Sequence, residues 1–403
     1  MQYFFILGKN PTLSLAEIVA VLSLKPEQVI FLSEEVMIAD ISTEIDAQAM
    51  IRRLGGTIKI GVINDQLSMT NSQSMINFLM TNIKDNNKSG KFHFGISYYG
   101  DKRFDEKKLG MEIKSTLKEQ DISSRWVTSK EKVLSSVVVE QNKLVSDKGI
   151  EIVIFDSGKE QRIGHTLVVQ PFKELSKRDY GRPGRDDFSG MLPPKLAQMM
   201  LNLGARHPKG VPSTLLDPFC GSGTILTEAA LMGYQKLIGC DASAKAIEDT
   251  KKNFQWMQKT YNLELKTHNF FQCKVENLNQ KVKPNSVDMI ITEPYLGPSR
   301  AKRDKESIKK IIKELEELYY QAIKQFIKAL KNNGTLVMIW PVFKAKDTIF
   351  LSSKNILGKS NFRVINPLEN FDNSIIKLTN RRTIVYGREG QKVWREIVIL
   401  KKG

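Results

Sequence analysis

Three short stretches combine residue types that could bind a ligand and transfer a group. The first, DPFCGSGT at 217–224, lies between an apolar run and a helical stretch. Glycines permit a tight turn and close approach of a ligand, and a helix start offers free N–H groups. The spacing matches neither phosphate-binding glycine pattern, and an acid at the strand end would repel phosphate. A ligand with an amine and a carboxylate, such as methionine, fits better, and a purely structural turn is the alternative. The residues assigned to this site are Asp217, Pro218, Cys220, Gly221, Ser222, Gly223 and Thr224.

The second stretch, KLIGCD, ends in Asp241 and is followed by Ala242. An acid at this strand end can accept hydrogen bonds from both hydroxyls of a ribose, and the alternative role is a helix N-cap. Together with the first stretch it indicates S-adenosylmethionine as the cofactor. In the next strand region, FFQCKVENL, Cys273 or Lys274 stands where an acid or polar residue would meet the adenine amine, and Lys274 is assigned to the cofactor site.

The third stretch, TEPYLG at 292–297, follows the apolar run VDMII. An exocyclic amine of a nucleobase is a poor nucleophile, because its lone pair is delocalised into the ring. Acceptors that bind its two N–H groups let the nitrogen pyramidalise toward a methyl donor, and an aromatic ring can stack on the base. Glu293, Pro294 and Tyr295 supply these parts, and Glu293 also borders the cofactor site. The alternative is a proline-punctuated strand end, but the order after the first two stretches favours catalysis.

The elements around these stretches predict an α/β domain over residues 191–403. Four apolar runs of strand length, TLLD, KLIGCD, VDMIIT and GTLVMIW, alternate with amphipathic helical stretches. This alternation indicates a parallel, doubly wound sheet that binds ligands at the carboxyl ends of its strands. The last stretch, RRTIVYGREGQKVWREIVILKKG, is expected to form a hairpin.

The N-terminal part reads as two small α+β units, at 1–65 and 66–172, followed by a linker at 173–190. In the first unit SLAE, at 14–17, is expected to open a helix as a capping box. The linker is assigned because its hydrophobic periodicity is weak and it contains three glycines.

Composition points to a polyanionic partner. The chain has 61 Lys and Arg against 44 Asp and Glu, a net charge of +17, which favours nucleic acid, although a solvated Lys-rich surface is the alternative. Three widely spaced cysteines and four scattered histidines argue against a zinc site or a disulfide framework and fit a reducing compartment. The N-terminus has no basic leader, and no apolar run reaches 18 residues. We therefore expect a cytoplasmic protein without a membrane span or a bound metal.

The motifs resemble those of class I methyltransferases, with DPFCGSGT similar to their cofactor loop. The strings FFILGKNPTLSLAEI, LGGTIKIG, SSRWVTSK and LSSVVVEQNKL resemble the THUMP-containing RNA methyltransferases, and the linker is similar to theirs. The nearest subgroup is the tRNA guanine-N2 methyltransferases that act at position 10. The resemblance implies a ferredoxin-like domain at 1–65, an RNA-binding THUMP domain at 66–172 and a Rossmann-like catalytic domain at 191–403.

The catalytic stretch departs from that family. Its usual TDPPYG aligns without gaps on TEPYLG, so that Glu293 replaces an Asp, Tyr295 replaces a Pro and Leu296 replaces a Tyr. Because Glu is one methylene longer than Asp, the identity of the methylated amine is left open, as is the number of methyl groups added.

Basic and aromatic residues supply candidate contacts to RNA, and each one could equally belong to a solvated face. The assigned residues are Arg125, Trp126, Lys130, Arg182, Arg300, Arg303, Arg381 and Arg382. The leading hypothesis is a tRNA guanine-N2 methyltransferase, acting as a monomer or with an accessory activator subunit. The alternatives are a DNA adenine-N6 or cytosine-N4 methyltransferase, and an RNA-binding homologue without activity.

Overall fold

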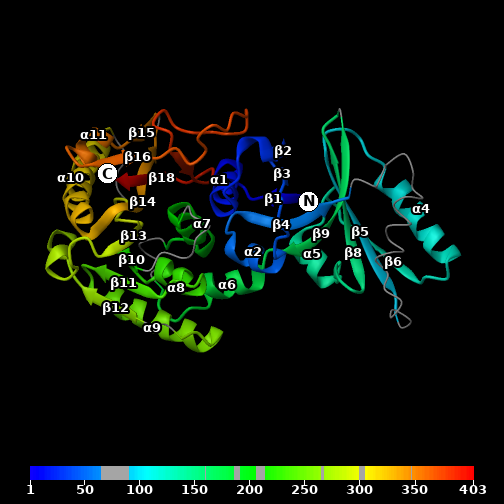
Figure 1. Ribbon diagram of the computed structural model, residues 1–403, viewed down its shortest axis with the longest axis horizontal. Coiled ribbons are helices and arrows are strands. Elements are labelled where there is room, and N and C mark those ends of the chain that lie inside the picture. The colour runs from blue at the N-terminus through cyan, green and yellow to red at the C-terminus, as the bar shows by residue number, and fades with distance from the viewer. Residues whose placement is uncertain are drawn as a thin grey trace. The chain divides into compact units, whose positions relative to one another are not determined.

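A computed structural model describes residues 1–64, 90–158, 160–185, 191–205, 214–264, 267–298, 305–345 and 347–403. These residues form two compact units (Figure 1). Unit 1 comprises Met1–Pro11, Lys25–Arg53 and Thr57–Phe172. Unit 2 comprises Thr12–Leu24, Leu54–Gly56 and Lys173–Gly403. None of the helices in the described part is long and apolar enough to cross a membrane.

Unit 1 is built on one sheet in the order β2-β3-β1-β4-β9-β8-β5-β6, with β7 paired to β8. Its strands are β1 Gln2–Leu7, β2 Val29–Leu32, β3 Val36–Asp40, β4 Thr57–Ile63, β5 Phe92–Gly100, β6 Ser124–Val127, β7 Val145–Ser146, β8 Gly149–Asp156 and β9 Gln161–Val169. The two predicted α+β units share this sheet, because β4 pairs antiparallel with β9. The predicted ferredoxin-like and THUMP domains remain predictions.

The helices of the N-terminal region are α1 Pro11–Leu22, η1 Pro26–Gln28, α2 Ala47–Arg53, α4 Glu106–Glu119 and α5 Ser136–Gln141. The predicted start of α1 at the SLAE stretch is wrong, because the helix begins three residues earlier, at Pro11. Ser14 is buried and donates a hydrogen bond to the Gly56 carbonyl instead of capping the helix. Tertiary contacts thus use the two polar residues of the supposed capping box, since buried Glu17 accepts from the Gly55 and Gly56 amides.

Unit 1 contains an ion pair between two strands of its sheet that is buried away from water. Lys59 on β4 and Glu151 on β8 form an ion pair, and their side chains are 1% and 0% exposed. Glu151 also accepts from the hydroxyls of Ser97 and Thr166, and Lys59 donates to the Leu134 carbonyl. These bonds offset the cost of removing both charges from water, and they join four strands of the sheet.

Unit 2 contains the predicted parallel sheet. Its order is β12-β11-β10-β13-β14-β18-β16; the first five strands pair in parallel, and β18 runs antiparallel to β14. The strands are β10 Thr214–Asp217, β11 Lys236–Asp241, β12 Thr267–Gln272, β13 Val287–Thr292, β14 Leu330–Lys344, β15 Thr348–Phe350, β16 Phe362–Val364, β17 Ile384–Tyr386 and β18 Val393–Lys402. The predicted C-terminal hairpin is confirmed, because β17 pairs antiparallel with β18.

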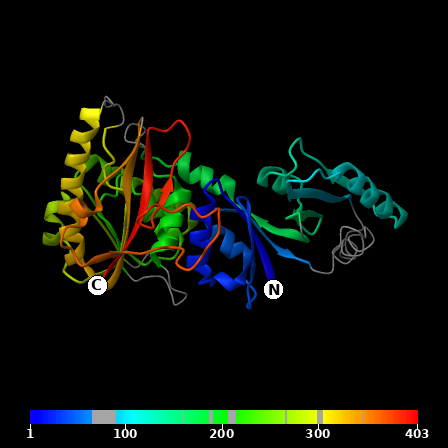
Figure 2. The ribbon, with the colours of Figure 1, turned by 90° about the horizontal axis from the view of Figure 1, so that it is seen from above.

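Helices cover both faces of this sheet (Figure 2). They are α6 Phe172–Tyr180, α7 Pro194–Ala205, α8 Thr224–Leu231, α9 Ala244–Tyr261, η2 Val275–Gln280, α10 Lys305–Ala329 and α11 Ser353–Leu357. Alternate residues of β13 point to opposite faces. Ile290 packs with Leu315 and Tyr319 of α10, whereas Gly204 of α7 lies so close to Met289 that a Cβ atom there would be 2.5 Å from its sulfur. The sheet is therefore buried on both sides.

The segment predicted as a linker at 173–190 contains regular structure. Its first part forms α6, and Arg178 of that helix is buried in an ion pair with Glu228 of α8. Gly184 exchanges hydrogen bonds with the side chain of Asn253 on α9. Residues 173–185 thus pack into unit 2, and the rest of the predicted linker, 186–190, lies outside the described residues.

Candidate active site

The carboxyl ends of neighbouring strands bring the predicted acids to one edge of the unit 2 sheet. Asp217 is the last residue of β10, Asp241 is the last residue of β11, and Glu293 follows β13. Strand β10 lies between the other two. Residues that are 24 and 76 positions from Asp217 in the sequence thereby meet at a single edge.

Asp217 is buried, with 1% of its surface exposed. One carboxyl oxygen accepts hydrogen bonds from the Thr292 hydroxyl at 2.8 Å and from the Phe219 amide at 3.2 Å. Burial, and to a smaller extent the nearby Asp241 and Glu293 carboxylates, raise the pKa of Asp217 to about 8 against the effect of these two bonds. The carboxyl is therefore mainly protonated at neutral pH, and a cation placed beside it would favour its ionised form.

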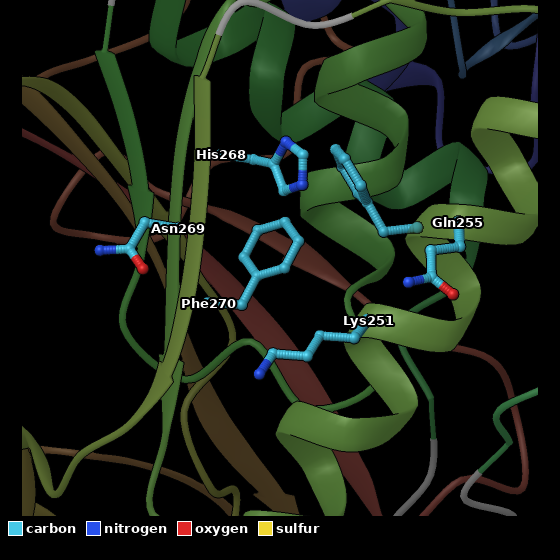
Figure 3. Close-up of a pocket in the computed structure, with 6 residues that line it drawn as sticks. Lys251, Gln255, His268, Asn269 and Phe270 are labelled. Atoms are coloured by element: carbon cyan, nitrogen blue, oxygen red, sulfur yellow. The ribbon is translucent and has the colours of Figure 1, made fainter.

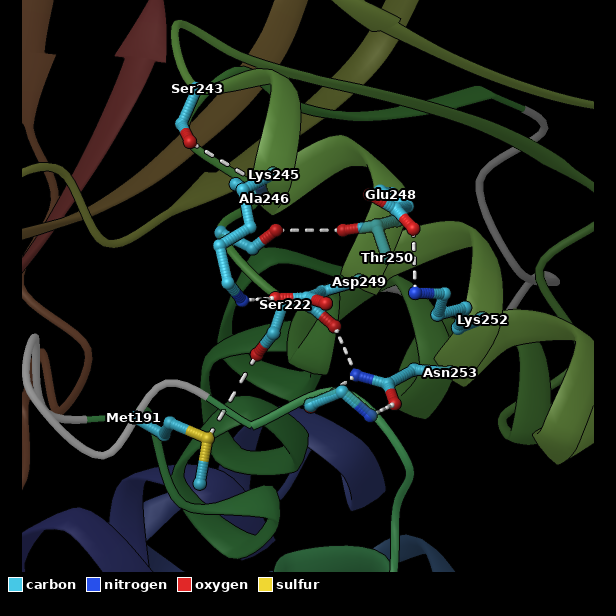
Figure 4. Close-up of polar contacts among 12 residues, drawn as sticks. Met191, Ser222, Ser243, Lys245, Ala246, Glu248, Asp249, Thr250, Lys252 and Asn253 are labelled. Atoms are coloured by element: carbon cyan, nitrogen blue, oxygen red, sulfur yellow. Dashed lines mark hydrogen bonds and ion pairs between the residues drawn. The ribbon is translucent and has the colours of Figure 1, made fainter.

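The glycine-rich loop after β10 needs two residues in the left-handed region. Gly221 has φ +50° and Gly223 has φ +84°, and Gly223 lies at the N-cap of α8. A Cβ atom on Gly221 would meet nothing within 4 Å, so there is open space beside the loop. Helix α9 supports the loop from behind: the Thr250 hydroxyl donates to the Gly221 carbonyl, and Asn253 donates to the Ser222 carbonyl, each at 2.8 Å (Figure 4).

Asp241 links this loop to the start of α9. Its two carboxyl oxygens accept from the Gly221 amide at 3.0 Å and from the Ser243 amide at 2.9 Å. The alternative role of Asp241 as the helix N-cap is wrong, because the N-cap is Ser243, whose hydroxyl accepts from the Ala246 amide (Figure 4). Asp241 is half-buried beside the open space at Gly221, which suits a polar ligand group.

The remaining predicted cofactor residues lie around the same edge. Thr224 begins α8, the Pro218 and Ala242 carbonyls accept from the side chains of Cys240 and Gln272, and exposed Lys274 precedes η2. The three cysteines are buried, and burial raises the pKa of the Cys220 and Cys240 thiols. Because the thiolate is the reactive form, a raised pKa makes these two buried cysteines unreactive.

Glu293 has a partner that sequence reasoning missed. Arg395 of β18 donates from Nε to Oε1 of Glu293 at 2.6 Å, and the two side chains are only 14% and 12% exposed. Burial raises the pKa of Glu293, and the Arg395 guanidinium lowers it. Among the described residues, Arg395 is the hydrogen-bond partner of this carboxylate, and it bonds to Oε1.

The loop after Glu293 combines a fixed backbone with an open ring. Pro294 is buried, and the Tyr295 carbonyl accepts at 2.8 Å from the hydroxyl of Tyr319, a fully buried residue of α10. The Tyr295 side chain is 57% exposed. Gly297 adopts φ +96°, which turns the chain at the end of the loop. An exposed ring on a fixed backbone can serve as a stacking surface.

Three of the predicted RNA-binding residues make close contacts within the protein. Arg182 is 5% exposed, and its guanidinium donates to the Thr224 hydroxyl. Arg381 pairs with buried Glu396. Trp126 packs so closely on α4 that a Cβ at Gly110 would lie 2.5 Å from its ring. Burial tells against an RNA contact at Arg182, whereas Arg381 and Trp126 are half-buried, and the prediction stays open at these two positions.

The other RNA candidates divide into two groups. Arg125, Lys130 and Arg382 are exposed. Arg300 and Arg303 lie outside the described residues. The prediction of an RNA contact therefore stays open at all five positions.

A cavity of about 330 Å³ lies between α9 and the edge strand β12 (Figure 3). It is lined by Lys251, Phe254, Gln255, His268, Asn269 and Phe270. None of these residues belongs to the predicted site, and the rings of Phe254, His268 and Phe270 pack on one another.

Two protein families match the chain. A family described as an RMKL-like methyltransferase domain matches residues 182–364, and one described as DNA methylase matches residues 24–252, more than half of the chain. The whole chain also aligns with all of TrmN from Thermus thermophilus, at a TM-score of 0.54 and 15% identity, a likeness of fold alone.

Curated relatives are named for a specific reaction. The tRNA (guanine(10)-N2)-dimethyltransferase of Methanocaldococcus jannaschii is 33% identical over 185 residues, which cover 44% of this chain and 47% of the relative. The enzyme of the same name from Methanothermobacter thermautotrophicus is 30% identical over 173 residues, covering 41% of this chain and 45% of the relative. The chain thus spans about half the length of the curated relatives it matches.

Proposed function

This chain belongs to the DNA methylase family of methyltransferases, and we propose that it uses S-adenosylmethionine to methylate the exocyclic N2 amine of a guanosine in tRNA, at position 10. The observation that carries the proposal is the meeting of Asp217, Asp241 and Glu293 at one sheet edge, in a chain similar to two enzymes named for this reaction. The net charge of +17 supports an RNA substrate.

The cofactor residues have complementary tasks in this proposal. Asp217 would accept from the ammonium of the methionine part, because a buried carboxyl with a raised pKa gains most from a cation. The open space at Gly221 would let the ligand approach the backbone. Asp241 would give up its hydrogen bond from the Gly221 amide and accept hydrogen bonds from the ribose hydroxyls. When bound, the cofactor supplies an electrophilic methyl group.

The target amine would be held by the loop after β13. Oε2 of Glu293 would accept one N–H, the fixed backbone at Pro294 would accept the other, and the Tyr295 ring would stack on the base. Arg395 anchors Oε1 and opposes the rise in the pKa of Glu293 that burial causes. The hydrogen bond from Arg395 would draw the Glu293 carboxylate toward β18. This would offset the extra methylene of Glu relative to the Asp of the family.

The substrate would be bound partly by the N-terminal half of the chain. We infer that residues 1–65 and 66–172 act as ferredoxin-like and THUMP domains, that exposed Arg125 and Lys130 contact tRNA, and that the protein works in the cytoplasm as a monomer or with an activator subunit. The motifs SSRWVTSK and LSSVVVEQNKL support the domain assignment.

The direct test is incubation with isotopically labelled methyl donor and an unmodified tRNA transcript, followed by digestion to nucleosides and mass spectrometry. We expect N2-methylguanosine, and N2,N2-dimethylguanosine if both hydrogens are replaced. A transcript with adenosine at position 10 serves as the control. Label in any nucleoside other than guanosine would contradict the proposed target.

The match to the DNA methylase family makes a DNA amino-methyltransferase the second candidate. Competition between unmodified tRNA and duplex DNA for labelled methyl groups distinguishes the two, and preferential labelling of adenine N6 or cytosine N4 in DNA would establish the second. The third candidate, an inactive RNA-binding homologue, predicts cofactor binding without transfer to any RNA, in the parent and in a Glu293→Ala variant alike.

A further inference from the structure

A second cavity lies in unit 2, apart from the strand-end acids. It has a volume of about 620 Å³, within the range of small-molecule sites. It is lined by Phe350, Lys377, Leu378, Thr379, Asn380, Arg381 and Val385. None of these residues except Arg381 was assigned a function from the sequence.

A tight turn forms the polar wall of this cavity. The Thr379 amide donates to the Thr383 carbonyl at 2.9 Å, and Leu378 bridges to Ile384. Arg382 adopts φ +65° in the turn, and Asn380 at its tip is exposed. The Thr379 hydroxyl accepts from the Thr383 amide and bonds to the Thr383 hydroxyl, so the side-chain amide of Asn380 is the polar group that the wall presents.

An aromatic ring and a guanidinium form the opposite part of the lining. Phe350 is 38% exposed, and the Arg381 guanidinium lies 5.5 Å from its ring centroid and 5.1 Å from that of Trp340. Arg381 is fixed by the fully buried Glu396 and by the Leu351 carbonyl. Its charge is compensated and its guanidinium lies over both rings, so the exposed part of the Phe350 ring is the surface that suits a planar ligand.

The cavity is connected to the candidate active site through β14 and β18. Strand β14 pairs with the end of β13 at Met338 and continues beyond it to Val342, which pairs with Phe350. On β18, Glu396, which holds Arg381, and Arg395, which holds Glu293, are consecutive residues and therefore point to opposite faces of the sheet. Phe350 therefore lies beyond the carboxyl ends of the parallel strands, on the side where the catalytic loop lies.

We propose that this cavity binds a second nucleotide of the RNA strand that carries the target guanosine, an inference that rests on the proposed function. A base stacks on Phe350, its polar edge meets Asn380, and its phosphate lies beside the exposed residue Lys377. An unstacked, single-stranded nucleotide fits this chemistry, because aromatic stacking combined with a basic group is how proteins bind such strands. The site would keep the strand in place while the neighbouring base enters the catalytic loop.

The experiment measures binding of a fluorescently labelled tRNA transcript to the full-length chain by anisotropy. We expect Phe350→Ala to weaken binding about tenfold, the usual loss for one stacked base, and Phe350→Trp to retain the parent affinity. Lys377→Gln should weaken binding by a few-fold and reduce its salt dependence. Tyr180→Ala and Lys354→Gln, which change exposed residues outside the cavity, serve as controls. Unchanged affinity for S-adenosylmethionine verifies that each variant is folded.

A second arm locates the RNA directly. Photo-cross-linking with tRNA that contains 4-thiouridine should label peptides that include Phe350 or residues 377–381, and free nucleoside monophosphates should compete only weakly. Equal tRNA affinity of Phe350→Ala and the parent, with cross-links elsewhere, would overturn the inference while methylation by the parent preserves the proposed function. Tight binding of a free nucleotide with no effect on RNA would overturn it as well, and absence of tRNA binding by the parent would overturn both.

Discussion

Asp217 and Glu293 are buried carboxyl groups at the ends of neighbouring strands, yet their surroundings differ. Asp217 accepts hydrogen bonds from an uncharged hydroxyl and an amide, and its pKa rises to about 8. Glu293 is paired with the Arg395 guanidinium, which counters the effect of burial on its pKa.

The difference separates two tasks at one sheet edge. A buried carboxyl without a cationic partner is prepared to receive a cation from outside, which fits the ammonium of a cofactor. A carboxyl that already has a cation stays ionised and can accept a hydrogen bond from an uncharged amine. The predictions below test this division, in order of decreasing effect on activity.

Replacing Glu293, the proposed acceptor for the target amine, should have the largest effect on kcat. Glu293→Gln retains the shape of the side chain but cannot remain an anionic acceptor, so kcat should fall by roughly 10²- to 10⁴-fold, while the Kd for S-adenosylmethionine changes little. Single-turnover methylation of tRNA and calorimetric cofactor binding measure the two quantities. Glu389→Gln, at an exposed position, is the matched control. A parallel loss of cofactor affinity would show that Glu293 does not have a separate task.

Replacing Asp217, the proposed acceptor for the cofactor ammonium, should weaken cofactor binding. Asp217→Asn removes a charge-assisted hydrogen bond of roughly 1.5–3 kcal/mol, so the Kd for the cofactor should rise about 10- to 100-fold. Because the raised pKa keeps Asp217 mainly protonated at pH 7 and a bound ammonium favours the carboxylate, binding to the parent should release close to one proton. Calorimetry in buffers with different ionisation enthalpies measures this release, and Asp217→Asn should abolish it.

The same carboxyl predicts a pH dependence of stability. Its folded pKa of about 8 lies above the ordinary value of 3.8, so its stabilising contribution is complete below pH 3.8 and is lost as pH rises through about 8. Without cofactor, the Tm of the parent should therefore fall relative to that of Asp217→Asn between pH 5 and pH 8. A constant difference across this range would contradict the raised pKa.

Removing the partner of Glu293 should have a smaller effect that depends on pH. Without the guanidinium, Arg395→Met leaves burial to raise the pKa of Glu293 further, so the acidic limb of the kcat profile should shift to higher pH. We expect the loss of kcat relative to the parent to be greatest at the acidic end of the pH range and to diminish as pH rises. Arg395→Lys should restore the profile in part. A uniform loss at all pH values would indicate a purely structural role for Arg395.

The Lys59–Glu151 ion pair of unit 1 should affect stability without affecting cofactor binding. Lys59→Met leaves Glu151 charged and unpaired, which should destabilise this sheet by about 3–5 kcal/mol. Hydrogen exchange should show lower protection of the β4 and β8 amides, while cofactor affinity stays at the parent value. The double variant Lys59→Met, Glu151→Leu should recover much of the lost protection. Loss of cofactor binding in these variants would contradict a role confined to unit 1.

Local sequence was sufficient to predict the features that depend on a single helix or strand. The alternation of apolar runs and amphipathic stretches predicted the parallel sheet, because strand and helix periods differ and both faces of the sheet are buried. Local sequence was not sufficient where a partner lies far away along the chain. Arg395 is 102 positions from Glu293. Ser14 and Glu17 form hydrogen bonds with residues 55 and 56 instead of capping their own helix. Arg182 could be recognised as buried only once its partner was in place.

The sequence by itself determined which residues stand at the strand ends, since Asp217, Asp241 and Glu293 each follow an apolar run. Only the tertiary structure decided how those acids behave, because the pKa of a carboxyl depends on its burial and on charges brought close by the fold. Thr292 and Phe219 surround Asp217 with uncharged donors, whereas an antiparallel strand from the end of the chain carries a guanidinium to Glu293.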